Sequence, residues 1–206
     1  MGRRFAELAF TPAVKAQQQQ HGSRDLYERV EQSNDPGDRL GLDERAFIQS
    51  RDGFYLASTT ESGWPYIQFR GGPKGFLRVL DDRTLGFADL RGNKQYISVG
   101  NLQNNDRVAL FLMDYPSQSR LKILGHAKVH EGDAAARALI EGLRMPGERT
   151  PAERALIIQI EAFDWNCPQH ITPRYTEGEL AKILEPMRSR LASLEAENKR
   201  RRAVQN

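Results

Sequence analysis

The residues best suited to binding an anion lie where a predicted strand passes into a predicted helix. Residues 85–89 have the pattern of a strand, and residues 92–102 have the spacing of a helix. Backbone N–H groups at a helix start attract anions, and Lys94 adds a positive charge in the predicted first turn. Arg70 ends a neighbouring predicted strand, and Arg120 precedes another. These cations could hold a phosphate at the mouth of a barrel, although an ordinary helix start with surface charge accounts for the same residues.

A second polar segment, residues 164–174, follows the last predicted strand. Indole, amide and imidazole groups make directed hydrogen bonds to the edge of a planar heterocycle. The candidates for such contacts are Trp165, Asn166, Gln169 and His170. A purely structural loop is the alternative interpretation. Cys167 is expected to be a small buried hydrophobe rather than a reactive thiol.

Patterns typical of several enzyme classes are missing from the sequence. There is no Walker-type phosphate loop, no GxGxxG after a predicted strand and no GxSxG nucleophile elbow. The four histidines are scattered. His126 and His130 lie four apart in a predicted strand, where a solvent-facing pair is a better interpretation than two zinc ligands. No metal site is therefore expected.

Composition excludes further classes. Hydrophobic residues make up 39% of the 206 residues, enough for a sizeable core. No apolar run is long enough for a membrane span or a secretory signal, and a single cysteine cannot form an internal disulfide. Thirty basic and 27 acidic residues give a net charge of +3, much of it near the C-terminus. We therefore expect a cytoplasmic protein without a membrane partner, and we do not expect nucleic-acid binding.

The first zone of the chain, residues 1–40, is polar and predicts a helical arm. Pro12 can open one helix, and Ser23 can cap a second helix over residues 24–32. These helices carry too little apolar surface to fold alone. We expect the arm to lie on the main body or on a partner subunit.

The middle zone, residues 41–174, predicts an antiparallel β domain. Short strands alternate with tight polar turns, and only two helical stretches are inserted. The predicted strands are residues 54–60, 64–70, 76–80, 84–88, 108–113, 121–129 and 155–163, and the helices are residues 92–102 and 133–143. This order favours a mainly β fold with flanking helices (α+β), an antiparallel barrel rather than a doubly wound sheet.

The last zone, residues 175–206, predicts an amphipathic helix with a basic tail. Its apolar residues at roughly heptad spacing are Leu180, Ile183, Leu184, Met187, Leu191 and Leu194. Pro186 interrupts this pattern and is expected to kink or restart the helix. The helix either docks on the body or pairs with its own copy, and the basic residues 199–202 are expected to be a solvated tail.

On these residues the chain resembles the pyridoxamine 5'-phosphate oxidase-like FMN-binding split-barrel superfamily, especially its flavin-nucleotide-binding branch. The resemblance spans roughly residues 41–174. It depends on the strand order, on Gly-Asn-Lys-Gln at 92–95 after Phe-Ala-Asp at 87–89, and on the long segment 164–174. The N-terminal residues 10–15 and 22–24 resemble that branch as well.

The resemblance implies a homodimer of six-stranded antiparallel Greek-key split barrels with two FMN sites at the interface. The cofactor-binding positions that it implies are Gln68, Arg70, Phe87, Ala88, Asp89, Asn93, Lys94, Gln95, Arg120, Trp165, Asn166, Gln169 and His170. Gln68 stands where the parent oxidases have an arginine, and Asn93 replaces the arginine of their Arg-Lys step. Arg70 and Arg120 could restore those charges. The segment from Trp165 onward is expected to approach the flavin from the second subunit.

The function that the resemblance implies is that of an FMN-dependent oxidoreductase acting on an unidentified small molecule, with NAD(P)H as a candidate electron donor. His170 is the candidate proton donor, because imidazole titrates near neutral pH. The parent oxidases' C-terminal substrate signature is not reproduced, so pyridoxamine phosphate is not expected as substrate. The alternatives are a non-catalytic flavin sensor or carrier, and a barrel that holds a deazaflavin or haem.

Overall fold

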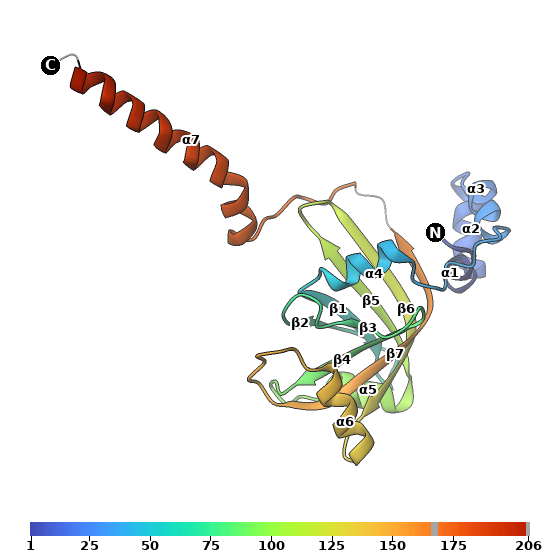
Figure 1. Cartoon of the computed structure of the whole chain (residues 1–206). Coiled ribbons are helices and arrows are strands. Elements are labelled where there is room, and N and C mark those ends of the chain that lie inside the picture. The colour runs from blue at the N-terminus through green and yellow to red at the C-terminus, as the bar shows by residue number, and fades with distance from the viewer. Residues whose placement is uncertain (166–168, 205–206) are drawn as a thin grey trace.

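One antiparallel sheet forms the body of the protein, and helices flank it (Figure 1). The computed structural model describes residues 1–165 and 169–204. The strands are β1 Gly53–Thr59, β2 Pro65–Gly71, β3 Arg78–Val79, β4 Thr84–Leu90, β5 Arg107–Asp114, β6 Ser119–His130 and β7 Ala152–Trp165. The helices are α1 Arg3–Ala9, α2 Pro12–Gln20, α3 Arg24–Glu31, α4 Leu42–Gln49, α5 Ile97–Asn104, α6 Ala134–Leu143 and α7 Glu177–Val204.

The strand order is β2-β1-β5-β6-β7-β4-β3, and neighbouring strands are antiparallel. This confirms the predicted fold class, a mainly antiparallel sheet with flanking helices. The sheet has seven strands, as the strand pattern predicts, rather than the six that the resemblance implies; the additional short strand β3 pairs with β4. It is not closed: β2 and β3 are its two edges.

The predicted strands form three hairpins, β1–β2, β3–β4 and β5–β6, with differences in length from the prediction. The largest is at β3, predicted over residues 76–80 and observed only as Arg78–Val79. Phe76 leaves the ladder because its ring packs in the core, 5.7 Å from the ring of Phe54 and 6.2 Å from that of Phe87. β7 is longer than the predicted strand 155–163.

Most of the hydrophobic core comes from one face of these strands. Alternate residues of β1, β5 and β6 are buried, as period-two strands with one covered face require. Where β6 crosses β7, the register shifts between Leu124 and Gly125. A Cβ at Gly125 would lie 2.3 Å from the carbonyl oxygen of Gln159, so only glycine fits this close approach.

The N-terminal arm lies on its own body through α1, which packs beside β7. Arg4 pairs with Glu161 of β7 at 2.7 Å. Pro12 opens α2 as predicted, with Thr11 as its cap. The predicted cap of α3 is wrong: Ser23 makes no capping hydrogen bond, because its backbone is not in the extended conformation that capping requires.

The C-terminal helix α7 projects away from the body (Figure 1). Its six apolar residues from Leu180 to Leu194 are all exposed, and Pro186 lies inside one continuous helix. Docking on the body of its own chain is therefore wrong as an interpretation. Across residues 1–165 and 169–204, no helix is both long and apolar enough to cross a membrane.

Candidate functional site

A cavity of about 210 Å³ lies where β2, β4 and β7 meet the loop before α5. We call it the basic cavity; its principal lining residues are Gln68, Arg70, Asp89, Lys94, Ser98 and Arg154. Side chains from strands far apart in sequence therefore converge with the start of α5. Two of the three cations predicted to bind an anion, Arg70 and Lys94, lie here together.

Asp89 joins two arginines at the floor of the basic cavity. Its side chain is buried; one carboxylate oxygen is 2.5 Å from Arg70 Nη1 and the other is 2.9 Å from Arg154 Nη1. These bonds tie β4 to both β2 and β7. Arg70 is thus partly neutralised by Asp89. Its Nε is buried and has no hydrogen-bond partner in the described part of the chain.

Arg154 is the most heavily paired of these groups. Besides Asp89, it contacts Glu131 at 2.9 Å and Glu153 at 3.0 Å. Burial alone would lower the pKa of the Arg154 guanidinium, but its hydrogen bonds to Glu131 and Asp89 outweigh burial and raise that pKa. Its guanidinium also lies 5.0 Å from the ring centroid of Tyr96. Arg154 is therefore a fixed positive charge in the cavity wall.

The loop before α5 corrects the sequence-based prediction. The helix begins at Ile97, not at Gly92, so Lys94 is not in its first turn. Asn93 accepts a hydrogen bond from the Gln95 N–H at 3.2 Å, a turn that competes with helix formation. Lys94 and Tyr96 then take left-handed φ values of 61° and 54°, which cost energy for residues other than glycine.

The loop nevertheless places at the cavity the two kinds of group predicted to bind an anion, a lysine side chain and backbone N–H groups at a helix start. Lys94 lines the cavity, and within residues 1–165 and 169–204 it forms no ion pair. Ile97, Ser98 and Val99, the first turn of α5, also line it, and backbone N–H groups of a first turn have no partner inside the helix. The hydroxyl of Ser98 donates to Gln68 at 2.9 Å and fixes α5 against β2.

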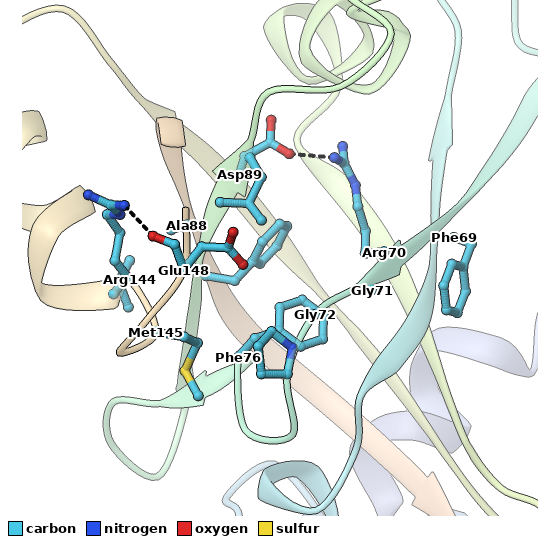
Figure 2. Close-up of a pocket in the computed structure, with 14 residues that line it drawn as sticks. Phe69, Arg70, Gly71, Gly72, Phe76, Ala88, Asp89, Arg144, Met145 and Glu148 are labelled. Carbon is cyan, nitrogen blue, oxygen red and sulfur yellow. Dashed lines mark hydrogen bonds and ion pairs between the residues drawn. The ribbon is translucent and has the colours of Figure 1, made fainter. Parts of the chain in front are cut away.

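A second cavity of about 170 Å³ adjoins the first (Figure 2). We call it the apolar cavity. Arg70, Asp89 and Leu90 line both cavities, while Phe76 and Met145 supply apolar surface to this one. Figure 2 shows Arg70 pointing toward Asp89 on one side of this cavity and Arg144 and Glu148, from the segment that follows α6, on the other side. Each cavity alone is smaller than the roughly 300–1,000 Å³ of typical small-molecule sites.

Two predicted residues, Phe87 and Ala88, line the apolar cavity rather than the basic one. The ring of Phe87 is 2% exposed and belongs to the core, with the guanidinium carbon of Arg70 5.8 Å from its centroid. Ala88 lines the apolar cavity. Asn93 and Gln95 line the basic cavity. Arg70 thus lies between the buried Phe87 ring and the basic cavity.

The remaining predicted residues lie at the other end of the sheet. Trp165 of β7 pairs with Leu121 of β6, and Arg120 directly precedes Leu121, whereas Arg154 is eleven residues from Trp165 along β7, roughly 36 Å. Trp165 packs on α4: its Nε1 donates to Glu44 at 2.7 Å. Within one chain, Arg120 and Trp165 therefore lie far from the basic cavity and do not line it.

Gln169 and His170 lie near that same distant end and are exposed. The side-chain amide of Gln118, in the β5–β6 turn, donates to the carbonyl of Ile171 at 2.6 Å and anchors the segment there. Asn166 and Cys167 fall outside the described residues. Within those residues, no group of three or more His, Cys, Asp or Glu side chains could hold a metal ion.

Sequence reasoning missed Arg154, Glu153 and Ser98 as members of the site. Arg154 lies in β7, 65 residues from Asp89, and nothing in local spacing connects them. One signal in the sequence could have indicated Arg154. The strand pattern assigns it to the buried face of the strand, and a buried arginine requires a carboxylate partner such as Asp89.

Comparison with known families agrees with this architecture. A family model for pyridoxamine 5'-phosphate oxidase matches residues 43–164, more than half of the chain. The chain belongs to the pyridoxamine 5'-phosphate oxidase family, which confirms the resemblance inferred from its motifs. No curated protein matches the sequence.

Several solved structures are similar to this chain. One is a protein from Clostridium acetobutylicum related to general stress protein 26, of the pyridoxinephosphate oxidase family (17% identity, 64% of this chain and 89% of that chain, TM-score 0.48). An FMN-binding protein from Syntrophomonas wolfei is 14% identical over 72% of this chain and 97% of that chain, with a TM-score of 0.46. An F420 reductase is 18% identical over 61% and 98%, with a TM-score of 0.45.

Proposed function

We propose that this protein is a homodimeric flavoprotein that binds FMN with its phosphate in the basic cavity and acts as an oxidoreductase on a small molecule. The observation that carries the proposal is the strained loop before α5, which points Lys94 into a cavity beside Arg70. Left-handed residues other than glycine persist where the surrounding structure enforces them, often at functional sites. Family membership supports a flavin as the ligand.

The basic cavity has the chemistry that a phosphate monoester requires. Lys94 supplies a cation without a carboxylate partner among the described residues, and the first turn of α5 supplies N–H donors. Arg70 lines the same wall and adds positive charge, part of which Asp89 offsets. The residues therefore fit the terminal anion of FMN. Binding is expected to depend on Lys94 most, since Asp89 already offsets part of the charge of Arg70.

The isoalloxazine ring would need more surface than either cavity of one chain provides. The apolar cavity adjoins the basic one, and each alone is smaller than a typical small-molecule site. The outer face of the sheet next to them carries exposed apolar side chains, with Ile67 62% and Phe69 59% exposed on the edge strand β2. We propose that a second copy covers this face and brings its own Arg120 and segment 169–174 toward the ring.

When bound, FMN supplies the hydride or electron chemistry itself. The protein's part is to fix the phosphate, exclude water from the ring and supply a proton. His170 is the proposed proton donor, in trans from the second subunit, because neither cavity is lined by a histidine among the described residues. A His170→Gln variant should keep FMN and lose turnover; unchanged turnover with its electron donor would exclude this role.

The first experiment is a visible absorbance spectrum of the purified protein, followed by release and identification of the chromophore. FMN at one per chain supports the proposal. A deazaflavin or a haem spectrum would replace FMN as the cofactor, and a colourless protein that neither quenches FMN fluorescence nor gains thermal stability from FMN would refute it. The single cysteine agrees with a reducing compartment, and the cytoplasm is the proposed location.

A non-catalytic flavin carrier or sensor is the second candidate. No histidine or cysteine is among the described residues that line the two cavities, so neither cavity has a thiol or an imidazole for chemistry, and this favours a carrier or sensor. Steady-state consumption of NADH or NADPH with a defined acceptor would exclude it. A flavin that is bound stoichiometrically and reduced by neither donor would favour it.

A further inference from the structure

Helix α7 carries a regular apolar seam that no described residue of its own chain covers. Six of its residues alternate at spacings of four and three: Leu180, Leu184, Met187, Leu191, Leu194 and Asn198. This is the a/d heptad pattern of a coiled coil, with Leu184, Leu191 and Asn198 at a positions. The five apolar members are 38–67% exposed. In the described part of the chain, no hydrogen bond or ion pair joins α7 to the sheet.

We propose that α7 pairs in parallel with α7 of a second copy of this chain. The seam from Leu180 to Asn198 extends about 27 Å along the helix axis, so each heptad layer of one helix can meet the same layer of its partner. Pro186 occupies a c position and faces away from the seam. This inference goes beyond flavin binding and does not depend on it.

Charge complementarity selects the partner and its orientation. In a parallel pair, a g residue lies near the e residue of the next heptad in the other helix. Here Arg190 at g would face Glu195 of the second copy, and Glu197 at g would face Arg202. Both contacts are attractive. Glu197 already pairs with Arg201 within its own helix at 2.6 Å, so its carboxylate is held on the same side.

Antiparallel pairing is disfavoured by the same residues. In an antiparallel pair, the apolar layers match when Leu184 of one helix lies opposite Leu194 of the other. This register would place Arg188 near Arg188 and Arg190 near Arg190 of the second copy, and these like charges repel. Asn198 also favours the parallel pair, because a single asparagine at an a position lies opposite its own copy only when the two helices are parallel and in register.

Disulfide cross-linking of the full-length protein tests the proposal. In a Cys167→Ser background, the variants Leu184→Cys and Leu194→Cys place a thiol on the seam, and Ser193→Cys places one on the outer face as the matched control. Each seam variant should form a covalent dimer by itself, at least about tenfold faster than the control, because adjacent thiols have an effective concentration in the millimolar range. Rates equal to that of the control would overturn the pairing.

Mixing the two seam variants distinguishes the orientations. If only the mixture cross-links, the helices are antiparallel and the proposal is wrong. The charge pattern gives a second check: Glu195→Arg, made in the Leu184→Cys background, should slow cross-linking, and adding Arg190→Glu should restore it. Failure of that restoration would contradict the g–e pairing. FMN content should stay unchanged in all these variants, so failure here leaves the flavin proposal standing.

Discussion

Replacing Asp89 by asparagine tests whether its buried carboxylate holds the site together. Asp89 is 5% exposed and accepts from Arg70 at 2.5 Å and from Arg154 at 2.9 Å. Asparagine keeps the shape and removes the charge, which leaves two largely buried guanidinium groups less well compensated. Removing one partner of a buried ion pair costs about 3–5 kcal/mol. In a chain of this length, 1 kcal/mol shifts Tm by about 2–4 °C, so the variant should lose at least about 6 °C.

The matched control is Asp82→Asn. Asp82 pairs with Arg39 at 2.6 Å, but both side chains are well exposed, and such a pair is worth about 0–1 kcal/mol. The assay is thermal unfolding of both variants and the parent at pH 7. Equal Tm losses for Asp89→Asn and Asp82→Asn would refute the reasoning.

Ligand binding gives the same variant a second readout. Without the Asp89 carboxylate, Arg70 carries its full charge into the basic cavity. FMN should therefore raise the Tm of Asp89→Asn by more than it raises the Tm of the parent. A smaller rise would show that Asp89 positions Arg70 for the phosphate rather than competing with it.

Two further predictions concern the scaffold. Gly125→Ala should cost about 1–3 kcal/mol in urea unfolding, because the new Cβ meets the carbonyl oxygen of Gln159 at 2.3 Å; an unchanged midpoint would contradict the close crossing of β6 and β7. Glu161→Gln should loosen the contact of α1 with β7 at pH 7. The hydrogen bond from Arg4 lowers the pKa of Glu161 from its ordinary 4.5, so its contribution is present above that value and lost as pH falls through the lower folded pKa. Limited proteolysis of the arm should therefore be faster in the variant at pH 7, and the difference should vanish in acid; equal rates at pH 7 would contradict the contact.

The sheet could be predicted because its signals are local. Alternating apolar and polar residues, together with Glu61-Ser62-Gly63 and the other short polar turns, predicted the strands that pair as hairpins in the structure. Helix α4 was not predicted, although its first turn carries a local signal. The side chain of Glu44 accepts from the N–H of Gly41 at 2.8 Å, and two acidic residues occupy its first turn.

The site could be predicted only in part, because its decisive contacts are not local. Lys94 was recognised from sequence, but the helix start was placed five residues too early, since side-chain turns and left-handed residues do not show in apolar spacing. The pairing of Asp89 with Arg70 and Arg154 joins three strands and depends on sheet order. The separation of Arg120 from the basic cavity likewise follows from which end of β6 it occupies.

The central claim, that the basic cavity holds the phosphate of FMN through Lys94, is tested most directly by titrating FMN and riboflavin into three proteins: the parent, Lys94→Ala and Lys128→Ala. Lys128 is an exposed lysine of β6 outside both cavities and serves as the control. A charge-assisted hydrogen bond contributes about 1.5–3 kcal/mol, so Lys94→Ala should weaken FMN binding by roughly 10–150-fold. Riboflavin, which lacks the phosphate, should bind the parent and Lys94→Ala equally well. FMN binding that is the same in Lys94→Ala and Lys128→Ala, or an equal loss for riboflavin, would contradict the account.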